Sequence, residues 1–472
     1  MKSLLRSLLI TGALVLALAL AYGALLAHPA PRISENATFS LAEPTEIEWV
    51  AVENAAGSYC FYYEDDGYVL DDIPGAIVDL EAFVDFMTGC GRLSAIRRVA
   101  DDAVAEYGLD TPAADVEIRF FDGNALRLAI GAQERISGDY YVKAERFPGI
   151  HLMASTMAEP FLQPKEQMIT KNVTPALAVT SPLAAIRDIT FTGGALDKPV
   201  TIWATADGGE QRQLAALSFG SATHLVHGAG VHQLDHTYGV EMLGSLFGIR
   251  ALDIAGYHLT DAEIGAMGFD SPWMTVEYDE INGANAAVER RMLKLARQSD
   301  DIFYAELDGS GAVFLIGRQP FMDIRYDMLP TRWFLTPMLM DLSAVTVEGE
   351  DRQYRFEIDN TDAKNPVVTF EGTNLDIRLF RSFFRLITSA AHDGVYLGAL
   401  EKPEAGELLA VTYEYSAPGK NLDVLSLFRG GVRRANVFVN GVGEFAMKDG
   451  FVSRVLEGCE NLLAGRPVEE NW

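Results

Sequence analysis

One short segment of the chain occurs twice, and this repetition limits the folds that the chain can adopt. Asp101–Pro112 reads DDAVAEYGLDTP, and Asp261–Pro272 reads DAEIGAMGFDSP. The first Asp, the central Gly, the second Asp and the Pro are identical in both copies. We expect the first Asp to cap a short helix, the Gly to end it in a left-handed conformation, and the second Asp and the Pro to shape a turn. Repetition of such a segment predicts a supersecondary unit that is used more than once.

Segments with the alternating pattern of strands surround both copies, and a third, more divergent set follows. In the first set they are Ile47–Val52, Tyr59–Tyr63, Gly67–Leu70, Val116–Phe120, Ala125–Gly131 and Tyr140–Val142. In the second set they are Ile186–Phe191, Val200–Thr205, Leu214–Val226, Met274–Tyr278, Met292–Arg297 and Ile302–Tyr304. In the third set they are Val345–Glu348, Tyr354–Ile358, Val367–Phe370, Leu408–Tyr415, Asn421–Phe428 and Asn436–Val439.

Each set also contains one segment in which apolar residues recur at the spacing of a single helix face. The three expected stripes are Leu80, Phe83, Val84 and Met87; Val240, Leu243, Leu246 and Phe247; and Leu375, Leu379, Phe383 and Leu386. A terminal helix is expected over Phe451–Leu463. We therefore predict an α+β fold of three repeated units, at residues 44–165, 182–325 and 340–465, each with hairpin-connected antiparallel strands and a packed helix.

The start of the chain, residues 1–31, has the pattern of a cytoplasmic tip followed by a membrane anchor. Residues 8–27 are almost all apolar, and Lys2 and Arg6 precede them. Twenty apolar residues in a helix span about 30 Å, the thickness of the hydrocarbon layer. The basic flank places the amino terminus in the cytoplasm and the body outside, in a periplasmic or extracellular location. A cleaved secretory signal is the alternative.

The net charge of −28 limits the partners of the chain. So negative a surface repels phosphate backbones, and we expect no nucleic-acid partner. Three cysteines cannot build a disulfide framework, although Cys60 and Cys90 could pair if the body is exported. A buried free thiol at Cys90 is the alternative.

After these features, the chain resembles a known family, domain of unknown function 4340. The resemblance rests on Asp79 and Leu80, on the Tyr-Gly-Leu-Asp-Thr-Pro run at Tyr107–Pro112, on Ile130-Gly131 and on the strand Tyr140–Val142. It implies a bacterial protein with one amino-terminal anchor and an exported body that accompanies an ATP-binding-cassette (ABC) transport system. It implies no catalytic residues and no cofactor.

The densest polar cluster is His224, His227, His232, Asp235 and His236. It reads as a hairpin turning at Gly228–Gly230, in which His224 and His227 point to opposite faces and His227 faces His232. A zinc or nickel site at His227, His232 and His236 is one interpretation, and a solvated hairpin with incidental histidines is the other.

Three arginines, Arg378, Arg381 and Arg385, form a basic stripe on the expected third helix. A docking face for an acidic partner is one interpretation, and a solvated face with local ion pairs is the other.

These features favour a non-enzymatic, single-pass, extracytoplasmic protein with an accessory or binding role, whose partners are ABC-type transporter subunits or other envelope proteins. A metal-dependent or carbohydrate-active enzyme centred on the histidine hairpin is the second hypothesis. A soluble binding protein released by signal cleavage is the third.

Overall fold

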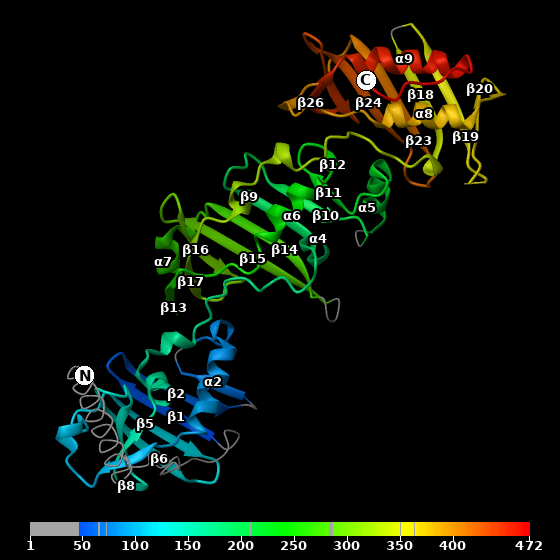
Figure 1. Cartoon of the computed structure of the whole chain (residues 1–472). Coiled ribbons are helices and arrows are strands. Elements are labelled where there is room, and N and C mark those ends of the chain that lie inside the picture. The colour runs from blue at the N-terminus through cyan, green and yellow to red at the C-terminus, as the bar shows by residue number, and fades with distance from the viewer. Residues whose placement is uncertain are drawn as a thin grey trace, which may run out of the picture. The chain divides into compact units, whose positions relative to one another are not determined.

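The computed structural model describes residues 47–472 except 65–66, 72, 207–208, 283–286, 350 and 363. The described residues form two compact units, within residues 47–170 and 171–472 (Figure 1). The expected anchor at residues 8–27 lies outside the described residues. Within the described ranges, no helix is long and apolar enough to cross a membrane. The expected division into three units stays a prediction.

The first unit contains one eight-stranded antiparallel sheet in the order β3-β2-β1-β5-β6-β7-β8-β4. Its strands are β1 (Ile47–Asn54), β2 (Gly57–Glu64), β3 (Gly67–Leu70), β4 (Arg97–Ala100), β5 (Ala114–Phe120), β6 (Ala125–Gln133), β7 (Tyr140–Ala144) and β8 (Phe147–Met153). Side chains alternate strictly along β5, with Val116 and Ile118 buried and Asp115 exposed. One face of this sheet is therefore a core face, and the opposite face is polar.

Helix α2 (Leu80–Cys90) covers the core face of this sheet (Figure 1). The side chain of Asp79 accepts a hydrogen bond from the backbone N–H of Ala82 and caps the helix. Its buried residues are Phe83, Phe86, Met87 and Cys90. The expected stripe was wrong in part, because Leu80 is 71% and Val84 51% exposed. Phe86 packs on Phe61 of β2 at a ring-centroid distance of 5.0 Å. Because Phe86 faces the sheet, Val84 lies on the exposed side of the helix.

The repeated segment forms a short 3-10 helix, η3 (Val104–Tyr107), in the first unit. Gly108 follows it with a φ of 68°, as expected for a left-handed helix end. The expected cap by Asp101 was wrong, because η3 has no side-chain cap. In the second copy, α7 (Asp261–Ile264) is capped by Thr260, one residue before the repeated Asp.

The second unit contains two nine-stranded antiparallel sheets. The first of them, called here the second sheet, has the order β12-β11-β10-β9-β14-β15-β16-β17-β13. Its strands are β9 (Ile186–Gly193), β10 (Val200–Ala204), β11 (His224–His227), β12 (Val231–Gln233), β13 (Asp253–Tyr257), β14 (Met274–Asn282), β15 (Ala287–Arg297), β16 (Ile302–Leu307) and β17 (Ala312–Gly317). Its helices are α4 (Pro182–Ala185), α5 (Gly209–Ala216), α6 (His236–Gly244) and α7; a further short helix, α3 (Ser155–Ala158), belongs to the first unit.

The expected strand over Leu214–Val226 was wrong in its first half. Residues up to Ala216 belong to α5, and β11 begins only at His224. The helix formers Gln213, Leu214 and Ala215 explain this difference, because their side chains lose little freedom in a helix.

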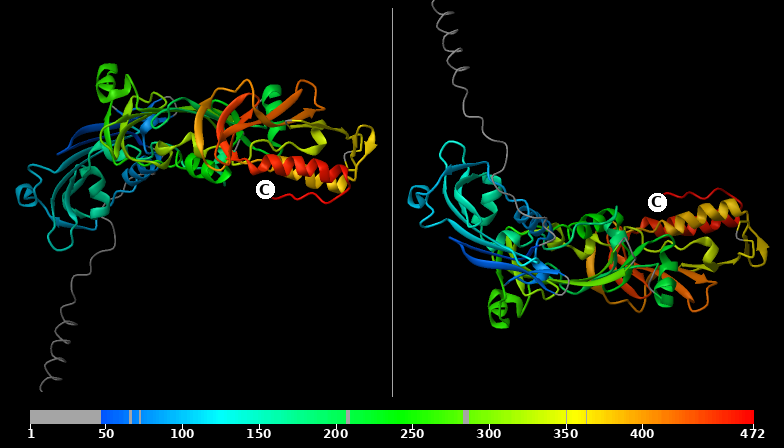
Figure 2. Two further views of the ribbon diagram at one scale, coloured as in Figure 1. Left: turned by 90° about the horizontal axis from the view of Figure 1, so that it is seen from above. Right: turned by 90° about the horizontal axis from the view of Figure 1, so that it is seen from below.

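The third sheet has the order β21-β20-β19-β18-β23-β24-β25-β26-β22. Its strands are β18 (Leu342–Gly349), β19 (Gln353–Asp359), β20 (Val367–Phe370), β21 (Thr373–Asn374), β22 (Tyr396–Leu400), β23 (Glu407–Tyr415), β24 (Leu422–Gly431), β25 (Arg434–Val439) and β26 (Val442–Lys448). Helices α8 (Ile377–Thr388) and α9 (Gly450–Leu463) lie side by side on it (Figure 2). The chain end returns to them, where Trp472 donates from Nε1 to Ser389 Oγ at 2.8 Å.

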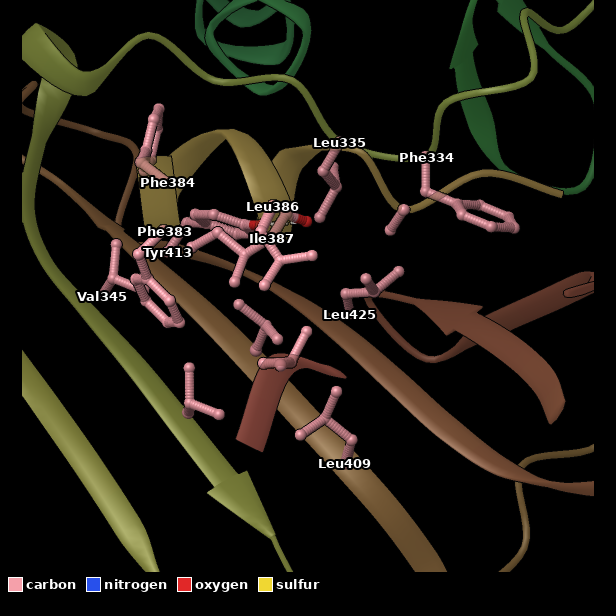
Figure 3. Close-up of a cluster of buried hydrophobic side chains, with 14 of the residues drawn as sticks. Phe334, Leu335, Val345, Phe383, Phe384, Leu386, Ile387, Leu409, Tyr413 and Leu425 are labelled. Carbon is pink, nitrogen blue, oxygen red and sulfur yellow. Dashed lines mark hydrogen bonds between the residues drawn. The ribbon is translucent and has the colours of Figure 1, made fainter. Parts of the chain in front are cut away.

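A continuous hydrophobic core lies beneath α8 and α9. Phe383 and Leu386 of α8 pack with Val345 of β18 and Leu425 of β24, and Tyr413 of β23 lies among them (Figure 3). The Tyr413 hydroxyl donates to the backbone oxygen of Ile387 at 3.2 Å, which satisfies its one buried polar group. The core extends to Trp203 and Leu225 of the second sheet and to Phe219, which precedes β11, so the two sheets share one core.

Within the described residues, the three sheets have equivalent strand orders, except that the first sheet shows no counterpart of the outermost strands β12 and β21. The first strand of each sheet also carries a bulge at the same place. The bulged residue is Glu48 between Ile47 and Trp49, Arg187 between Ile186 and Asp188, and Ser343 between Leu342 and Ala344. This shared register makes position-by-position comparison of the sheets possible.

Candidate functional site

The structure separates the histidines of the hairpin. In the pairing of β11 with β12, Val226 is opposite His232 and His227 is opposite Val231, so His227 and His232 do not form a cross-strand pair. His232 is buried, at 6% exposed, whereas His227 is exposed. His236 is exposed at the start of α6, where Asp235 caps the helix. Among the residues that the structure describes, no group of three His, Cys, Asp or Glu side chains could hold a metal ion.

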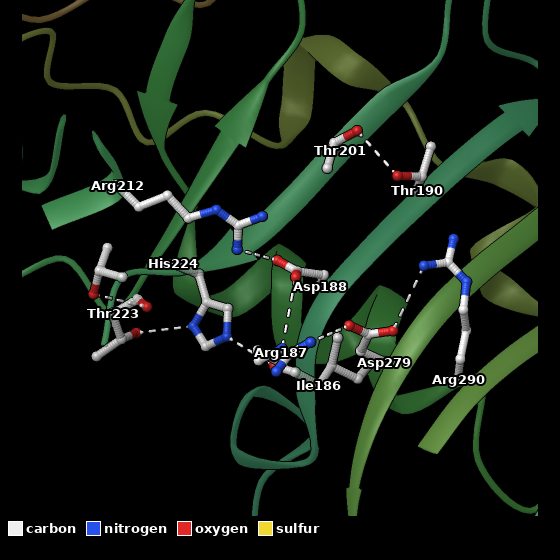
Figure 4. Close-up of polar contacts among 11 residues, drawn as sticks. Ile186, Arg187, Asp188, Thr190, Thr201, Arg212, Thr223, His224, Asp279 and Arg290 are labelled. Carbon is white, nitrogen blue, oxygen red and sulfur yellow. Dashed lines mark hydrogen bonds and ion pairs between the residues drawn. The ribbon is translucent and has the colours of Figure 1, made fainter. Parts of the chain in front are cut away.

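His224 is a structural residue of the second sheet. Its Nε2 lies 3.2 Å from the backbone oxygen of Ile186, and its Nδ1 lies 3.2 Å from the Thr223 hydroxyl (Figure 4). Burial lowers the pKa of this imidazole, which favours its neutral form. Both ring nitrogens are therefore used in local hydrogen bonds.

His232 connects the second and third sheets through Glu444 of β26. The His232 Nε2 lies 2.8 Å from Glu444 Oε2, and the Tyr326 hydroxyl donates to the same oxygen at 2.9 Å. The backbone N–H of Gly230 is a third donor, at 3.2 Å. Burial by itself would raise the pKa of Glu444, but hydrogen bonds from His232, Tyr326 and Gly230 outweigh it and lower that pKa.

A second buried carboxylate, Asp423 of β24, lies at the same junction. Its partners are Ser218 Oγ at 2.7 Å, Tyr415 OH at 2.6 Å, Asn440 Nδ2 at 2.8 Å and Lys420 Nζ at 3.1 Å. Both His232 and Asp423 line a cavity of about 250 Å³. Ser218 precedes β11 of the second sheet, whereas Asp423 lies on β24 of the third sheet. The hydrogen bonds of Asp423 therefore join the two sheets.

A cavity of about 650 Å³ lies on the polar face of the first sheet and is called here the first-sheet groove. Its outward-facing side chains form two adjacent rows across five strands, β2, β1, β5, β6 and β7, and Glu145 directly follows the end of β7. The rows are Cys60, Ala51, Glu117, Arg127 and Glu145, and Ser58, Glu53, Asp115, Ala129 and Lys143. Asp71 also lines the groove, so its walls carry five carboxylates and two cationic groups.

One row of the first-sheet groove is neutralised internally. Glu117 accepts from Arg119 Nε at 2.9 Å and lies 3.3 Å from Arg127 Nε, and both arginines lower the pKa of its carboxyl group. Arg119 in turn lies over the ring of Trp49, 4.2 Å from its centroid.

The other row contains two carboxylates that face one another. Glu53 of β1 is directly opposite Asp115 of β5. Partial burial and the charge of Glu53 raise the pKa of the Asp115 carboxyl group. Within the described part of the chain, neither carboxylate forms an ion pair or a side-chain hydrogen bond.

The second sheet shows how this fold otherwise accommodates two facing carboxylates. Asp188 of β9 is directly opposite Asp279 of β14. Arg212 pairs with Asp188, and Arg187 Nη2 lies 2.6 Å from Asp279 (Figure 4). Arg290 lies 4.0 Å from Asp279 on its other side. Three guanidinium groups therefore surround this pair of acids.

Two of the three arginines of α8 form local ion pairs, and the third donates to a backbone oxygen. Arg378 Nη2 lies 2.9 Å from Asp376, and Arg385 Nε donates to Glu470 at 2.8 Å. Arg381 Nη2 donates to the backbone oxygen of Lys364 at 3.4 Å.

Cys60 and Cys90 lie on opposite faces of the first sheet. Cys60 lines the groove, and Cys90 is buried on α2 against the core face. Cys60, Cys90 and Cys459 are all free thiols, so the possible Cys60–Cys90 disulfide is absent.

Apart from Cys60, the groove residues were not among the residues singled out from the sequence. The alternation in VEIRF at Val116–Phe120 indicates that Glu117 and Arg119 share a face, but it does not reveal which strand lies beside them. The pairing of β1 with β5, which brings Glu53 to Asp115, crosses 62 residues of chain (115 − 53).

Comparison with known families finds a match to the family Domain of unknown function (DUF4340) over residues 73–223. This match confirms the resemblance inferred from the Tyr-Gly-Leu-Asp-Thr-Pro run. No curated protein and no solved structure matches the chain.

Proposed function

We propose that this chain is a non-enzymatic binding component of the cell envelope, anchored by residues 8–27, with its body outside the cytoplasm. In this role it accompanies the subunits of an ABC-type transport system. The match of residues 73–223 to DUF4340 supports the proposal, because the resemblance to that family implies an anchored, exported protein that accompanies an ABC-type transport system. The apolar segment behind Lys2 and Arg6 supports the anchor.

One observation carries the binding role: a single sheet design with the same bulge is used three times. We infer that the three sheets and their helices are α+β copies of one unit. Repeated units that each bury one sheet face and leave another polar offer extended surfaces to partners.

The buried polar groups of the second unit support a structural use of the histidine hairpin. A catalytic acid or base needs a free position toward its substrate. His232 is held by Glu444, and Asp423 has four side-chain partners. Both clusters connect residues of the second sheet region with residues of the third sheet that are more than 200 positions away in sequence. This structural role requires no catalysis.

The direct test is fractionation and co-purification of the full-length chain carrying a C-terminal tag. We expect the protein in the membrane fraction, and we expect a permease and an ATPase to be enriched with it after mild detergent extraction. The matched control replaces residues 1–31 with a cleavable secretory signal and should be released into the soluble extracytoplasmic fraction.

Recovery of the full-length protein only in the cytoplasmic fraction would contradict the proposal. So would stoichiometric zinc or nickel that survives chelator treatment and disappears in His232→Ala. A released full-length protein with a trimmed amino terminus would favour the secreted alternative over the anchored one.

A further inference from the structure

The first-sheet groove has the dimensions of a site for an extended chain. Its two rows cross five strands, from Ser58 and Cys60 on β2 to Lys143 and Glu145 at the other end. Neighbouring strands are about 4.8 Å apart, so four spacings give a length of about 19 Å. An extended peptide of about six residues has this length.

Small side chains leave part of the groove open. Ala51, Ser58 and Ala129 occupy three of the ten positions in the two rows. Ala129 lies between Asp115 and Lys143 and separates the cation from the acid. The volume of about 650 Å³ falls within the range of about 300–1,000 Å³ that is typical of ligand sites.

The equivalent positions of the second sheet are filled. The shared bulge aligns Glu53 and Asp115 with Thr192 and Thr275, and the next position across is Lys294 in place of Ala129. Lys294 Nζ lies 3.8 Å from Glu306. That row therefore has no pair of facing acids and no open alanine position.

The third sheet is filled in a different way. Its equivalent of Glu53 is Glu348, which accepts a hydrogen bond from Gln353. The equivalent of Asp115 is Ala410, and Ser426 beside it accepts from Lys402 Nζ at 3.4 Å. The open row with two facing acids is thus specific to the first sheet among the three equivalent rows described.

The facing carboxylates of the first-sheet groove lack a neutralising cation among the described residues. In the second sheet, arginines neutralise another pair of facing carboxylates. Asp188 and Asp279 are neutralised by Arg212, Arg187 and Arg290. A guanidinium group matches a carboxylate with two parallel donors, which makes it the best-fitting cation for such a pair. Among the described residues, no group of three or more His, Cys, Asp or Glu side chains could hold a metal ion.

We propose that the first-sheet groove binds an extended, arginine-bearing segment of a partner protein, with a guanidinium group of that segment between Glu53 and Asp115. This inference rests on the proposed binding function and names the surface and the chemistry of its partner. The guanidinium group provides the neutralisation that Arg212 and Arg187 provide within the second sheet.

The test measures binding of a fluorescein-labelled Arg-Ala-Arg-Ala-Arg-Ala peptide to the full-length chain in detergent by fluorescence anisotropy. We expect saturable binding that weakens as salt rises from 20 to 150 mM, because the contacts are partly exposed ion pairs. The double variant Glu53→Gln/Asp115→Asn should lose at least tenfold in affinity.

The matched control is Glu81→Gln/Glu106→Gln, which removes the same charge from exposed positions outside the groove. It should bind within twofold of the unchanged chain. Ala129→Lys provides a second variant, because it places the lysine of the second sheet into the groove. It should also lose at least tenfold in affinity while its unfolding midpoint stays the same or rises.

Equal loss in the groove and control variants, unchanged binding in Ala129→Lys, or no saturable binding at low salt would overturn the inference. Equally strong displacement by spermidine at matched charge would overturn the choice of a peptide. If transporter subunits co-purify with the chain but these results fail, the groove assignment falls and the proposed function stands. If the peptide binds as expected but no transporter subunit co-purifies, the groove assignment stands and the proposed association with a transport system falls.

Discussion

Glu444 holds the second and third sheets together through a single oxygen atom. Three donors converge on its Oε2, from His232, Tyr326 and Gly230. Its other oxygen, Oε1, is buried without a hydrogen-bond partner among the described residues. A group in this position contributes through its charge, and its loss leaves donors unsatisfied in the interior.

We expect Glu444→Gln to lower the free energy of unfolding of the second unit by about 1.5–3 kcal/mol at pH 7. The folded-state pKa of Glu444 lies below its ordinary value, so its stabilising contribution is complete above pH of about 4.3. That contribution is lost as pH falls through the lowered folded-state value.

Urea denaturation at a series of pH values measures this effect. The difference between the unchanged chain and Glu444→Gln should therefore narrow below pH of about 4. Glu357→Gln, at an exposed position of β19, should stay within about 0.5 kcal/mol throughout. A difference that does not depend on pH would show that the charge of Glu444 does not stabilise the junction.

Gly108 combines a left-handed backbone with close packing. A Cβ atom at this position would lie 3.0 Å from the backbone nitrogen of Ala132, whereas at Gly123 it would meet nothing within 4 Å. Both glycines have positive φ, so both replacements by Ala introduce backbone strain.

We expect Gly123→Ala to cost about 1 kcal/mol and Gly108→Ala about 2 kcal/mol or more, as measured by urea denaturation of the first unit. The difference between the two losses of unfolding free energy measures how closely the repeated segment packs on β6. Equal costs would mean that this segment does not need its close contact with the sheet.

At the level of elements, the sequence predicted which segments are helices or strands better than it predicted which helix face is buried. Gly67–Leu70 and Val367–Phe370 have the predicted bounds, because β-branched and aromatic residues concentrate there between turn residues. The face of α2 was wrong at Leu80 and Val84, because helical spacing alone fits more than one stripe around Phe83. The aromatic contact between Phe86 and Phe61, which are 25 residues apart in sequence (86 − 61), decides between them.

Phe86 and Leu80 provide a direct test of this face. Phe86 is 5% exposed and packs on both Phe61 and Phe161. We expect Phe86→Ala to lower the free energy of unfolding of the first unit by about 3–5 kcal/mol and Leu80→Ala by less than about 0.5 kcal/mol. Thermal and urea unfolding measure both variants, and a larger loss for Leu80→Ala would restore the stripe expected from spacing.

The candidate sites were harder to predict than the elements, because their partners are far apart in sequence. His232 was recognised as unusual from its neighbours, but its partner Glu444 lies 212 residues away. The acids of the first-sheet groove are ordinary exposed positions until β1 and β5 pair. Local patterns determine which side chains share a face, and long-range pairing determines which ones meet.

At the level of the whole molecule, three equivalent sheets differ mainly in how their polar faces are filled. The second sheet carries Arg212 and Lys294, and the third carries Arg355 paired with Glu414. Among the described residues, Glu53 and Asp115 of the first sheet have no such partners. We therefore expect the proposed binding role to involve the first unit, within or beside the segment that matches DUF4340.

Cys60 is a natural reporter for the claim that the body lies outside the cytoplasm with its groove accessible. It is partly exposed in the first-sheet groove, whereas Cys90 and Cys459 are buried. Burial and the neighbouring Asp71 raise the pKa of the Cys60 thiol, so labelling should be slow at pH 7 and faster at pH 9.

The decisive measurement is labelling of Cys60 by a membrane-impermeant maleimide on intact cells or, where an outer membrane is present, on spheroplasts, with Cys60→Ser as the control. We predict one label per chain without lysis, none in Cys60→Ser, and protection of Cys60 by the arginine-bearing peptide. Labelling that appears only after the cells are lysed would place the body in the cytoplasm and contradict the account.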